Sequence, residues 1–273
     1  MTGSLGRFGS LVSVAVLAYG LLCLLVFLFQ RSFIYFPLRW DEQTASRANP
    51  GYEEVRISTS DGETLHGWLL RRDGAPWTVV IFHGNAGNLE GHEAVMVPFR
   101  ALDLQVLLFD YRGYGLSTGK PTQGGLLRDG EAVVSYVERN LGVPLGRIVY
   151  FGNSLGTGVA VLLAVTRPPG RLILESAYDS LASVARRHYP FLPVGLLLRD
   201  RFDAGSVIGD LRSPILFFHP AEDEIIPVAC GRALFEKARE PKRFVTIPGA
   251  RHNDPPASFP PLYLDAIREF LGR

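Results

Sequence analysis

Hydrophobic positions follow two different patterns along this chain. Residues 11–29 form an uninterrupted run, rich in Leu, Val, Ala and Phe, without a charged side chain; from about residue 52, short apolar runs alternate with mixed segments. The first pattern predicts one long apolar helix, which at 1.5 Å per residue spans about 28 Å, close to the hydrocarbon core of a bilayer. The second pattern predicts a globular domain of strands and helices.

We interpret residues 1–31 as a retained N-terminal membrane anchor, a single transmembrane helix. The alternative is a cleaved signal peptide, whose apolar core would be about 7–15 residues long and would end in small residues at a cleavage site. Here the apolar core is longer, and the bulky sequence FIYFP at residues 33–37 follows it. Both features favour an anchor over a signal peptide.

Residues 32–51 are predicted to be a juxtamembrane linker with several aromatic side chains. Phe33, Tyr35, Phe36 and Trp40 have the composition of an aromatic belt at a membrane interface, and the alternative is that they pack on the following domain. Arginines after the apolar run outnumber the one before it, which favours a cytoplasmic C-terminal side. Two acidic residues among those arginines leave the side of the membrane open.

Residues 52–273 are predicted to form one α/β domain, which the length of 273 residues accommodates together with the anchor. Alternation of strands and helices predicts a doubly wound, mostly parallel sheet. The turn Asp61-Gly62 between the first two strands predicts a hairpin. Strands are expected at residues 55–58, 65–70, 78–82, 105–110, 148–151, 171–174, 214–218 and 243–247, and helices at about 92–102, 125–140, 157–165, 228–239 and from 262.

One segment, residues 177–212, interrupts this alternation. It contains an apolar, proline-punctuated stretch at residues 188–198, and it follows the strand after the helix at 157–165. A cap over a functional site would lie in this position, so we predict a short cap insertion. The alternative is an ordinary packing helix.

The strongest chemical signal lies at residues 147–166, where an apolar strand ends in Gly152-Asn153-Ser154-Leu155-Gly156 and a small-residue helix follows. A serine on a sharp strand-to-helix turn within G-x-S-x-G is the pattern of a nucleophile elbow. The helix N-terminus behind such a serine favours developing negative charge. We therefore predict that Ser154 is a nucleophile.

A second G-x-S-x-G occurs at residues 115–119, around Ser117. This serine lies several residues beyond its preceding strand, and Lys120-Pro121 follows where a helix would begin. We interpret this copy as a surface loop.

A nucleophilic serine needs a base, and the base needs an orienting acid. In the α/β-hydrolase order the acid and then the histidine follow the serine, which indicates His252, in the loop after the last strand. Glu222, Asp223 and Glu224 are all candidates for the acid. Two N–H donors should hold the oxyanion, and we predict those of Leu155 and Asn85, the latter in the glycine-rich loop after the strand at 78–82.

Composition excludes several other classes of protein. With 28 Lys and Arg against 27 Asp and Glu, the net charge of +1 gives no nucleic-acid-binding surface. Cys23 lies in the apolar run and Cys230 in the domain, which excludes an intradomain disulfide. The histidines have no metal-binding spacing, so we expect no zinc or other cofactor.

Taken together, these motifs resemble the α/β-hydrolase superfamily, and more closely the Bem46 and ABHD13-type membrane-anchored serine hydrolases. The resemblance covers nearly the whole chain and rests on HGNAGN, DYRGYGLSTGKPT, GNSLG, ESAYDSL, DEIIP and GARHND, which begin at residues 83, 110, 152, 175, 223 and 249. It implies that the acid is Asp223, which begins the D-x-x-[IV]-P segment, and that the Asp110 loop is structural. Two departures are Pro220, where His-Gly is usual, and Arg251, where a Gly is common and an arginine could contact a substrate carbonyl or phosphate.

The sequence therefore predicts an α/β-hydrolase fold and a serine hydrolase that cleaves acyl esters or thioesters, with lipid-like substrates favoured by the anchor and the apolar insertion. The implied partners are the bilayer and a small-molecule or lipid ester. A serine peptidase and a catalytically silent membrane scaffold are the alternatives.

Overall fold

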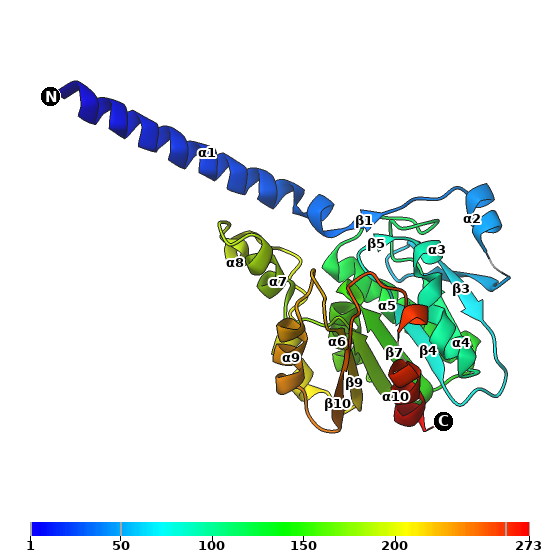
Figure 1. Cartoon of the computed structure of the whole chain (residues 1–273). Coiled ribbons are helices and arrows are strands. Elements are labelled where there is room, and N and C mark those ends of the chain that lie inside the picture. Colours follow the sequence, from blue (N-terminus) through cyan, green and yellow to red (C-terminus); the bar gives the residue numbers. More distant parts are fainter. Residues whose placement is uncertain (1, 50, 260, 273) are drawn as a thin grey trace.

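The computed structural model describes residues 2–49, 51–259 and 261–272, and it shows a long helix projecting from an α/β domain (Figure 1). The domain is built on one eight-stranded sheet in the order β10-β9-β8-β7-β4-β6-β3-β2. The pairs β2–β3 and β3–β6 are antiparallel and the others are parallel. The strands are β2 (Glu53–Ser58), β3 (Thr64–Leu70), β4 (Thr78–Phe82), β6 (Gln105–Phe109), β7 (Ile148–Asn153), β8 (Arg171–Glu175), β9 (Ile215–Pro220) and β10 (Lys242–Ile247). The predicted fold class and the predicted hairpin are confirmed.

Helices cover both faces of this sheet, which explains why its central strands are continuously apolar. Every residue of β4 and β6 is buried. One face packs on α5 (Gln123–Asn140), α6 (Leu155–Thr166) and α9 (Val228–Lys237), and the other on α3 (Leu89–His92), α4 (Val97–Ala101) and α10 (Pro261–Leu271). Single-turn 3₁₀ helices occupy Glu93–Met96, Leu145–Arg147, Ala204–Ser206, Ile208–Asp210 and Pro256–Ser258.

The prediction of a single helix at about 92–102 is wrong. The structure has α3, a 3₁₀ turn and α4 in its place, because Pro98 stands in the first turn of α4 and has no N–H to continue the preceding helical hydrogen bonds.

The N-terminal helix α1 (Thr2–Ile34) continues beyond residue 31, where the anchor was expected to end. Its segment Leu11–Ile34 is 24 residues long with a mean hydropathy of 2.8, so by length and composition it is able to cross a membrane. The chain then forms a short parallel pair between β1 (Phe36–Pro37) and β5 (Ala86–Gly87), followed by α2 (Glu42–Ala48).

The four aromatic side chains predicted to form a belt lie in two different environments. Phe33 and Phe36 are exposed, but the Tyr35 side chain is buried with its hydroxyl donated to Asp200, and Trp40 packs on Trp68 with ring centroids 6.0 Å apart. Tyr35 and Trp40 therefore pack on the domain, as the alternative interpretation expected, because β1 pairs with β5 of the domain directly after α1.

The insertion contains α7 (Leu181–His188) and α8 (Val194–Leu197). Both lie beside the C-terminal half of α1, on the same side of the molecule (Figure 1).

Candidate active site

Ser154 lies on a sharp turn between β7 and α6, with φ of 50° and ψ of −119°. This turn brings the backbones of the strand and the helix very close together. A Cβ on Gly156 would lie 1.9 Å from the Phe82 carbonyl oxygen, and one on Gly152 would lie 2.7 Å from Thr157 Cα. The two flanking glycines are therefore required by backbone contacts, and the strained serine is held by its N–H bond to the Glu175 carbonyl at 2.9 Å.

Three predicted site residues lie in one hydrogen-bonded row. The Ser154 hydroxyl oxygen is 3.1 Å from His252 Nε2, and His252 Nδ1 is 2.8 Å and 2.9 Å from the two carboxylate oxygens of Asp223. These side chains follow β7, β9 and β10, whose carboxyl ends meet at one edge of the parallel sheet. A carboxylate on Nδ1 requires that Nδ1 carries the proton, which leaves Nε2 free to accept one from the serine hydroxyl.

Among the three candidate acids, only Asp223 contacts the histidine side chain. Its Oδ1 also accepts the N–H groups of Ile225 at 3.0 Å and Ile226 at 2.6 Å. Burial acts to raise the pKa of Asp223, but the hydrogen bonds from His252 and Ile226 outweigh burial and lower the pKa below its usual value. Glu222 and Glu224 are exposed. The carboxyl group of Asp223 is thus kept ionised beside the imidazole.

The loop after β4 passes directly over the serine. A Cβ on Gly84 would lie 3.8 Å from Ser154 Cβ, so this part of the loop runs at van der Waals distance from the serine. Asn85 is fixed by framework contacts, since its carbonyl accepts from Phe36 N–H at 2.8 Å and from the Tyr114 hydroxyl at 2.7 Å. Leu155 N–H is in the first turn of α6, where amides have no partner within the helix.

Ser117 lies away from this row. Its segment is a loop with Thr118 and Gly119 exposed, as predicted, but the serine itself does not lie on the surface. The side chain is buried, donates its hydroxyl to the Asp110 carbonyl at 2.8 Å and accepts the His66 N–H at 2.9 Å. Buried backbone groups need hydrogen-bond partners, and this serine supplies them at the edge of β3. Arg251 is exposed and lies 3.8 Å from Glu224, outside the cavity described below.

Two buried side chains beneath the row were missed from the sequence. The Glu175 carboxylate accepts from Asn153 at 2.9 Å and from the Tyr263 hydroxyl at 2.7 Å, and burial raises its pKa. His219 Nε2 is 2.7 Å from the Ile226 carbonyl and 3.6 Å from Asp223. A polar residue at the end of each apolar strand was the available signal, since the site lies at those strand ends.

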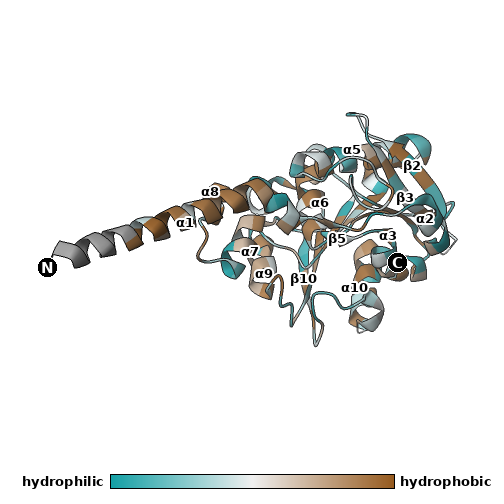
Figure 2. Ribbon diagram, turned by 90° about the horizontal axis from the view of Figure 1, so that it is seen from above, coloured by the Kyte–Doolittle hydropathy of each residue, from teal (hydrophilic) through white to brown (hydrophobic). Residues whose placement is uncertain are grey.

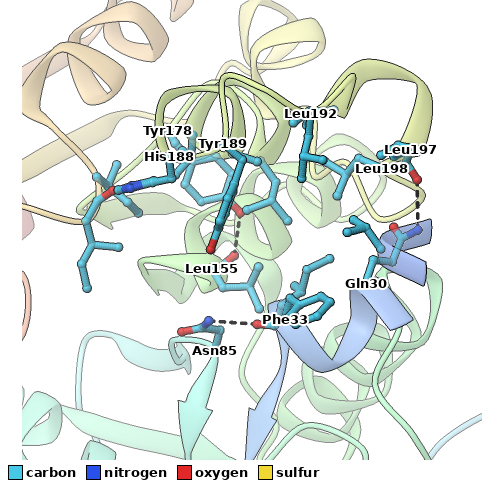
Figure 3. A pocket seen from close by; sticks show the side chains of 18 of the residues that line it. Gln30, Phe33, Asn85, Leu155, Tyr178, His188, Tyr189, Leu192, Leu197 and Leu198 are labelled. Atoms are coloured by element: carbon cyan, nitrogen blue, oxygen red, sulfur yellow. Dashed lines mark hydrogen bonds between the residues drawn. The ribbon is translucent and has the colours of Figure 1, made fainter. Parts of the chain in front are cut away.

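Ser154, Leu155 and Asn85 open onto a cavity of about 400 Å³. Side chains of the insertion and of α1 form most of its wall (Figure 3). Tyr178, at the start of the insertion, donates its hydroxyl to the Leu155 carbonyl at 3.3 Å. Ser154 and the two residues predicted to supply the oxyanion donors therefore border an apolar chamber. Among the residues that the structure describes, no three His, Cys, Asp or Glu side chains cluster as metal ligands would.

Comparisons with known proteins agree with this arrangement. The sequence profile of the α/β hydrolase fold matches residues 78–205. The chain is 40% identical over 272 residues to the uncharacterised protein Rv2307c of Mycobacterium tuberculosis, covering 98% of this chain and 97% of that protein. It is 29% identical over 271 residues to alpha/beta hydrolase domain-containing protein WAV2 of Arabidopsis thaliana, covering 90% and 88%.

A solved structure shows the same architecture. The esterase Pf2001 of Pyrococcus furiosus has a TM-score of 0.69 to this chain at 21% identity, covering 88% of this chain and 98% of the esterase. Fold, nucleophile-elbow geometry and sequence relatives lead to one conclusion, that the chain belongs to the α/β-hydrolase fold family.

Proposed function

We propose that this chain is a membrane-anchored serine hydrolase that cleaves acyl esters or thioesters of lipid-like substrates. The observation that supports it best is the hydrogen-bonded row from Ser154 through His252 to Asp223, with its serine in the wall of an apolar cavity. The resemblance of the sequence motifs to those of the Bem46 and ABHD13-type hydrolases supports the same assignment.

In the first half of the proposed reaction, Ser154 Oγ attacks the substrate carbonyl carbon while His252 Nε2 takes the hydroxyl proton. Asp223, ionised and hydrogen-bonded to Nδ1, stabilises the imidazolium that forms. The N–H groups of Leu155 and Asn85 hold the tetrahedral oxyanion. When this tetrahedral intermediate collapses, the bond between the carbonyl carbon and the leaving oxygen or sulfur breaks. The leaving group takes the proton from His252 and departs, and the acyl group remains as an ester on Ser154.

In the second half, water attacks the acyl group on Ser154 and gives a proton to His252. The second tetrahedral intermediate collapses, the proton returns to the serine oxygen, and the carboxylic acid leaves. No other reactant is needed, so the same three side chains serve both halves.

The apolar cavity supports the substrate class. Its wall is mostly leucine, isoleucine, valine and aromatic side chains, which favour an acyl chain at about 0.8 kcal/mol for each buried methylene group. The helix α1 would keep the domain at the membrane surface, where such substrates are concentrated.

Hydrolysis of p-nitrophenyl esters by the detergent-solubilised full chain tests this function. We expect Ser154→Ala to lower kcat at least about a thousandfold, because the nucleophile is lost. Ser117→Ala is the matched control and should keep most of the specific activity of the folded protein. Similar losses in both variants, or no hydrolysis by the wild-type protein, would contradict the proposal.

A further inference from the structure

Resting on the proposed hydrolase function, we propose that α1 forms one wall of the acyl pocket, so that the acyl chain of a membrane lipid enters sideways from the bilayer, between α1 and the cap. The anchor would then determine which acyl chains are accepted, in addition to holding the enzyme at the membrane. The cap consists of residues 177–212, the insertion that contains α7 and α8.

The cavity that begins at Ser154 is bounded by one face of α1. Leu22, Val26, Gln30 and Phe33 line it, at intervals of four, four and three residues, which is the spacing of neighbours along one helix face. The facing wall comes from the cap, from Leu181 in α7 to Leu198 after α8. Figure 3 shows Gln30 and Phe33 of α1 opposite Leu192, Leu197 and Leu198 of the cap. Without α1 the chamber would lack this side.

Polar contacts hold α1 against the cap. Gln30, a polar residue at the end of the apolar helix, is 5% exposed and makes two bonds to the cap backbone, from Nε2 to the Leu197 carbonyl at 3.0 Å and from Arg199 N–H to Oε1 at 2.7 Å. Closer to the domain, Asp200 of the cap accepts from Arg31, the next residue of α1, at 3.2 Å and from the Tyr35 hydroxyl, just after α1, at 3.0 Å. A buried amide with both groups paired fixes the position of a helix, so this wall is part of the folded domain.

The cap continues along α1 towards the N-terminus of the helix and exposes large apolar side chains there. Tyr19 in α1 donates its hydroxyl to the Phe191 carbonyl at 2.7 Å. Tyr189, Phe191 and Leu196 are 50%, 61% and 84% exposed. Helix α8 contacts α1, and Figure 2 shows this part of α1 coloured as hydrophobic. An exposed apolar patch that continues onto a membrane-length helix fits a lipid surface.

The depth of the cavity along α1 identifies the occupant. Arg31 marks the expected end of the hydrocarbon layer, because a guanidinium group is costly within it. At 1.5 Å per residue Leu22 lies about 13 Å deeper, close to the middle of a bilayer core about 30 Å thick. The segment from Leu22 to Gln30 therefore lies at the depth of the acyl chains of one leaflet.

Arg31 supplies positive charge at the level where the lipid phosphate groups would lie. Its Nε donates to Asp200 of the cap at 3.2 Å, which holds this charge beside the cap. A lipid whose headgroup stays at this level would extend its acyl chain along α1, so its ester would reach Ser154 from the hydrocarbon side of the pocket.

A pair of tryptophan variants in α1 tests the inference. Val26→Trp places an indole in the acyl pocket, and Leu28→Trp, about 200° further round the helix and 57% exposed, places one on the opposite face. The measurement is kcat/KM for p-nitrophenyl esters from acetyl to palmitoyl, with the full chain in phospholipid nanodiscs. We expect Val26→Trp to lower the ratio of dodecanoyl to acetyl activity at least about tenfold, the loss of roughly two buried methylene groups. Leu28→Trp should keep this ratio within twofold of wild type.

Equal changes in the two variants, or an unchanged ratio in Val26→Trp, would overturn the inference while leaving the proposed hydrolase function intact.

A second measurement does not depend on turnover. Ser154→Ala protein is placed in phosphatidylglycerol nanodiscs that also contain a phospholipid with a diazirine at the end of one acyl chain. The sample is irradiated, and the residues that form adducts are identified by mass spectrometry. We expect adducts on Leu181 and Val184 inside the pocket, lost on addition of Val26→Trp and kept with Leu28→Trp.

Adducts confined to the outward face of α1, at Leu24 and Leu28, would overturn the inference. If the pocket adducts form but the wild-type protein hydrolyses no ester, the lipid pocket stands and the proposed function fails. The two proposals therefore fail by different results.

Discussion

At the scale of single residues, Asp223 differs from its two acidic neighbours by its hydrogen bonds. Two backbone N–H groups and the His252 imidazole surround its buried carboxylate. The residues alone left Glu222, Asp223 and Glu224 open, since adjacent side chains on a loop have no periodicity that selects one. Asp223 followed only from the resemblance to a family pattern, and the structure brings this residue to the histidine.

We expect Asp223→Asn to lower kcat about 10⁴-fold, because an amide in place of the carboxylate leaves the imidazole in the wrong tautomer. Glu222→Gln and Glu224→Gln should each change kcat less than about tenfold. The measurement is ester hydrolysis by the three purified variants. A large loss of kcat in Glu222→Gln, together with near wild-type kcat in Asp223→Asn, would show that the acid is misassigned.

His219 lies behind Asp223 and should make folding stability depend on pH. Burial is the main cause that lowers the pKa of His219, although Asp223 acts in the opposite direction. As the pH falls through about 6.5, the His219 imidazole takes up a proton in the unfolded chain but stays neutral in the folded chain. The free energy of unfolding therefore falls by up to about 1.4 kcal/mol per pH unit.

We expect His219→Gln, which keeps an N–H donor for the Ile226 carbonyl, to lose this contribution. The gap in Tm between wild type and variant should therefore narrow as the pH is lowered from 7 to 5, measured by thermal unfolding of the detergent-solubilised proteins. A gap that stays constant from pH 8 to pH 5 would show that His219 is protonated as readily in the folded as in the unfolded chain.

At the scale of elements, the elbow between β7 and α6 is the best-determined part of the fold. We expect Gly156→Ala to destabilise the protein by about 3 kcal/mol or more, because its Cβ would meet the Phe82 carbonyl and force α6 away from β4. At this chain length that loss lowers Tm by roughly 6–12 °C. Gly195→Ala in α8 is the control: a Cβ there meets nothing within 4 Å, and the change in stability should stay within about 1 kcal/mol.

Prediction from the sequence succeeded where a pattern is local. The strand, turn and helix around Ser154 follow from residues 147–166 alone, and the alternation of apolar strands and helices was enough for the doubly wound sheet. Other features depended on contacts distant in sequence. The hydrogen bonds of the buried Ser117 with His66, of Tyr35 with Asp200 and of Gln30 with the cap join residues between 51 and 169 positions apart. No periodicity within one segment specifies such contacts.

At the scale of the whole molecule, α1 would both hold the domain at a membrane and close its pocket. We expect the full chain to remain in the membrane pellet after carbonate washing and to need detergent for release, since the 24-residue segment Leu11–Ile34 is long and apolar enough to cross a bilayer. N-terminal sequencing of the mature protein provides the control. A first residue beyond position 29 would show that the segment is a signal peptide and would remove the anchor from the account.

Labelling of the serine decides the chemistry. Full-chain protein is treated with a fluorophosphonate, digested, and mapped by tandem mass spectrometry. The expected result is one modified serine, Ser154, with labelling abolished in Ser154→Ala, reduced at least about a hundredfold in Asp223→Asn and retained in Ser117→Ala. Modification of Ser117, or undiminished labelling of the Ser154→Ala protein, would contradict a hydrolase built on Ser154, His252 and Asp223.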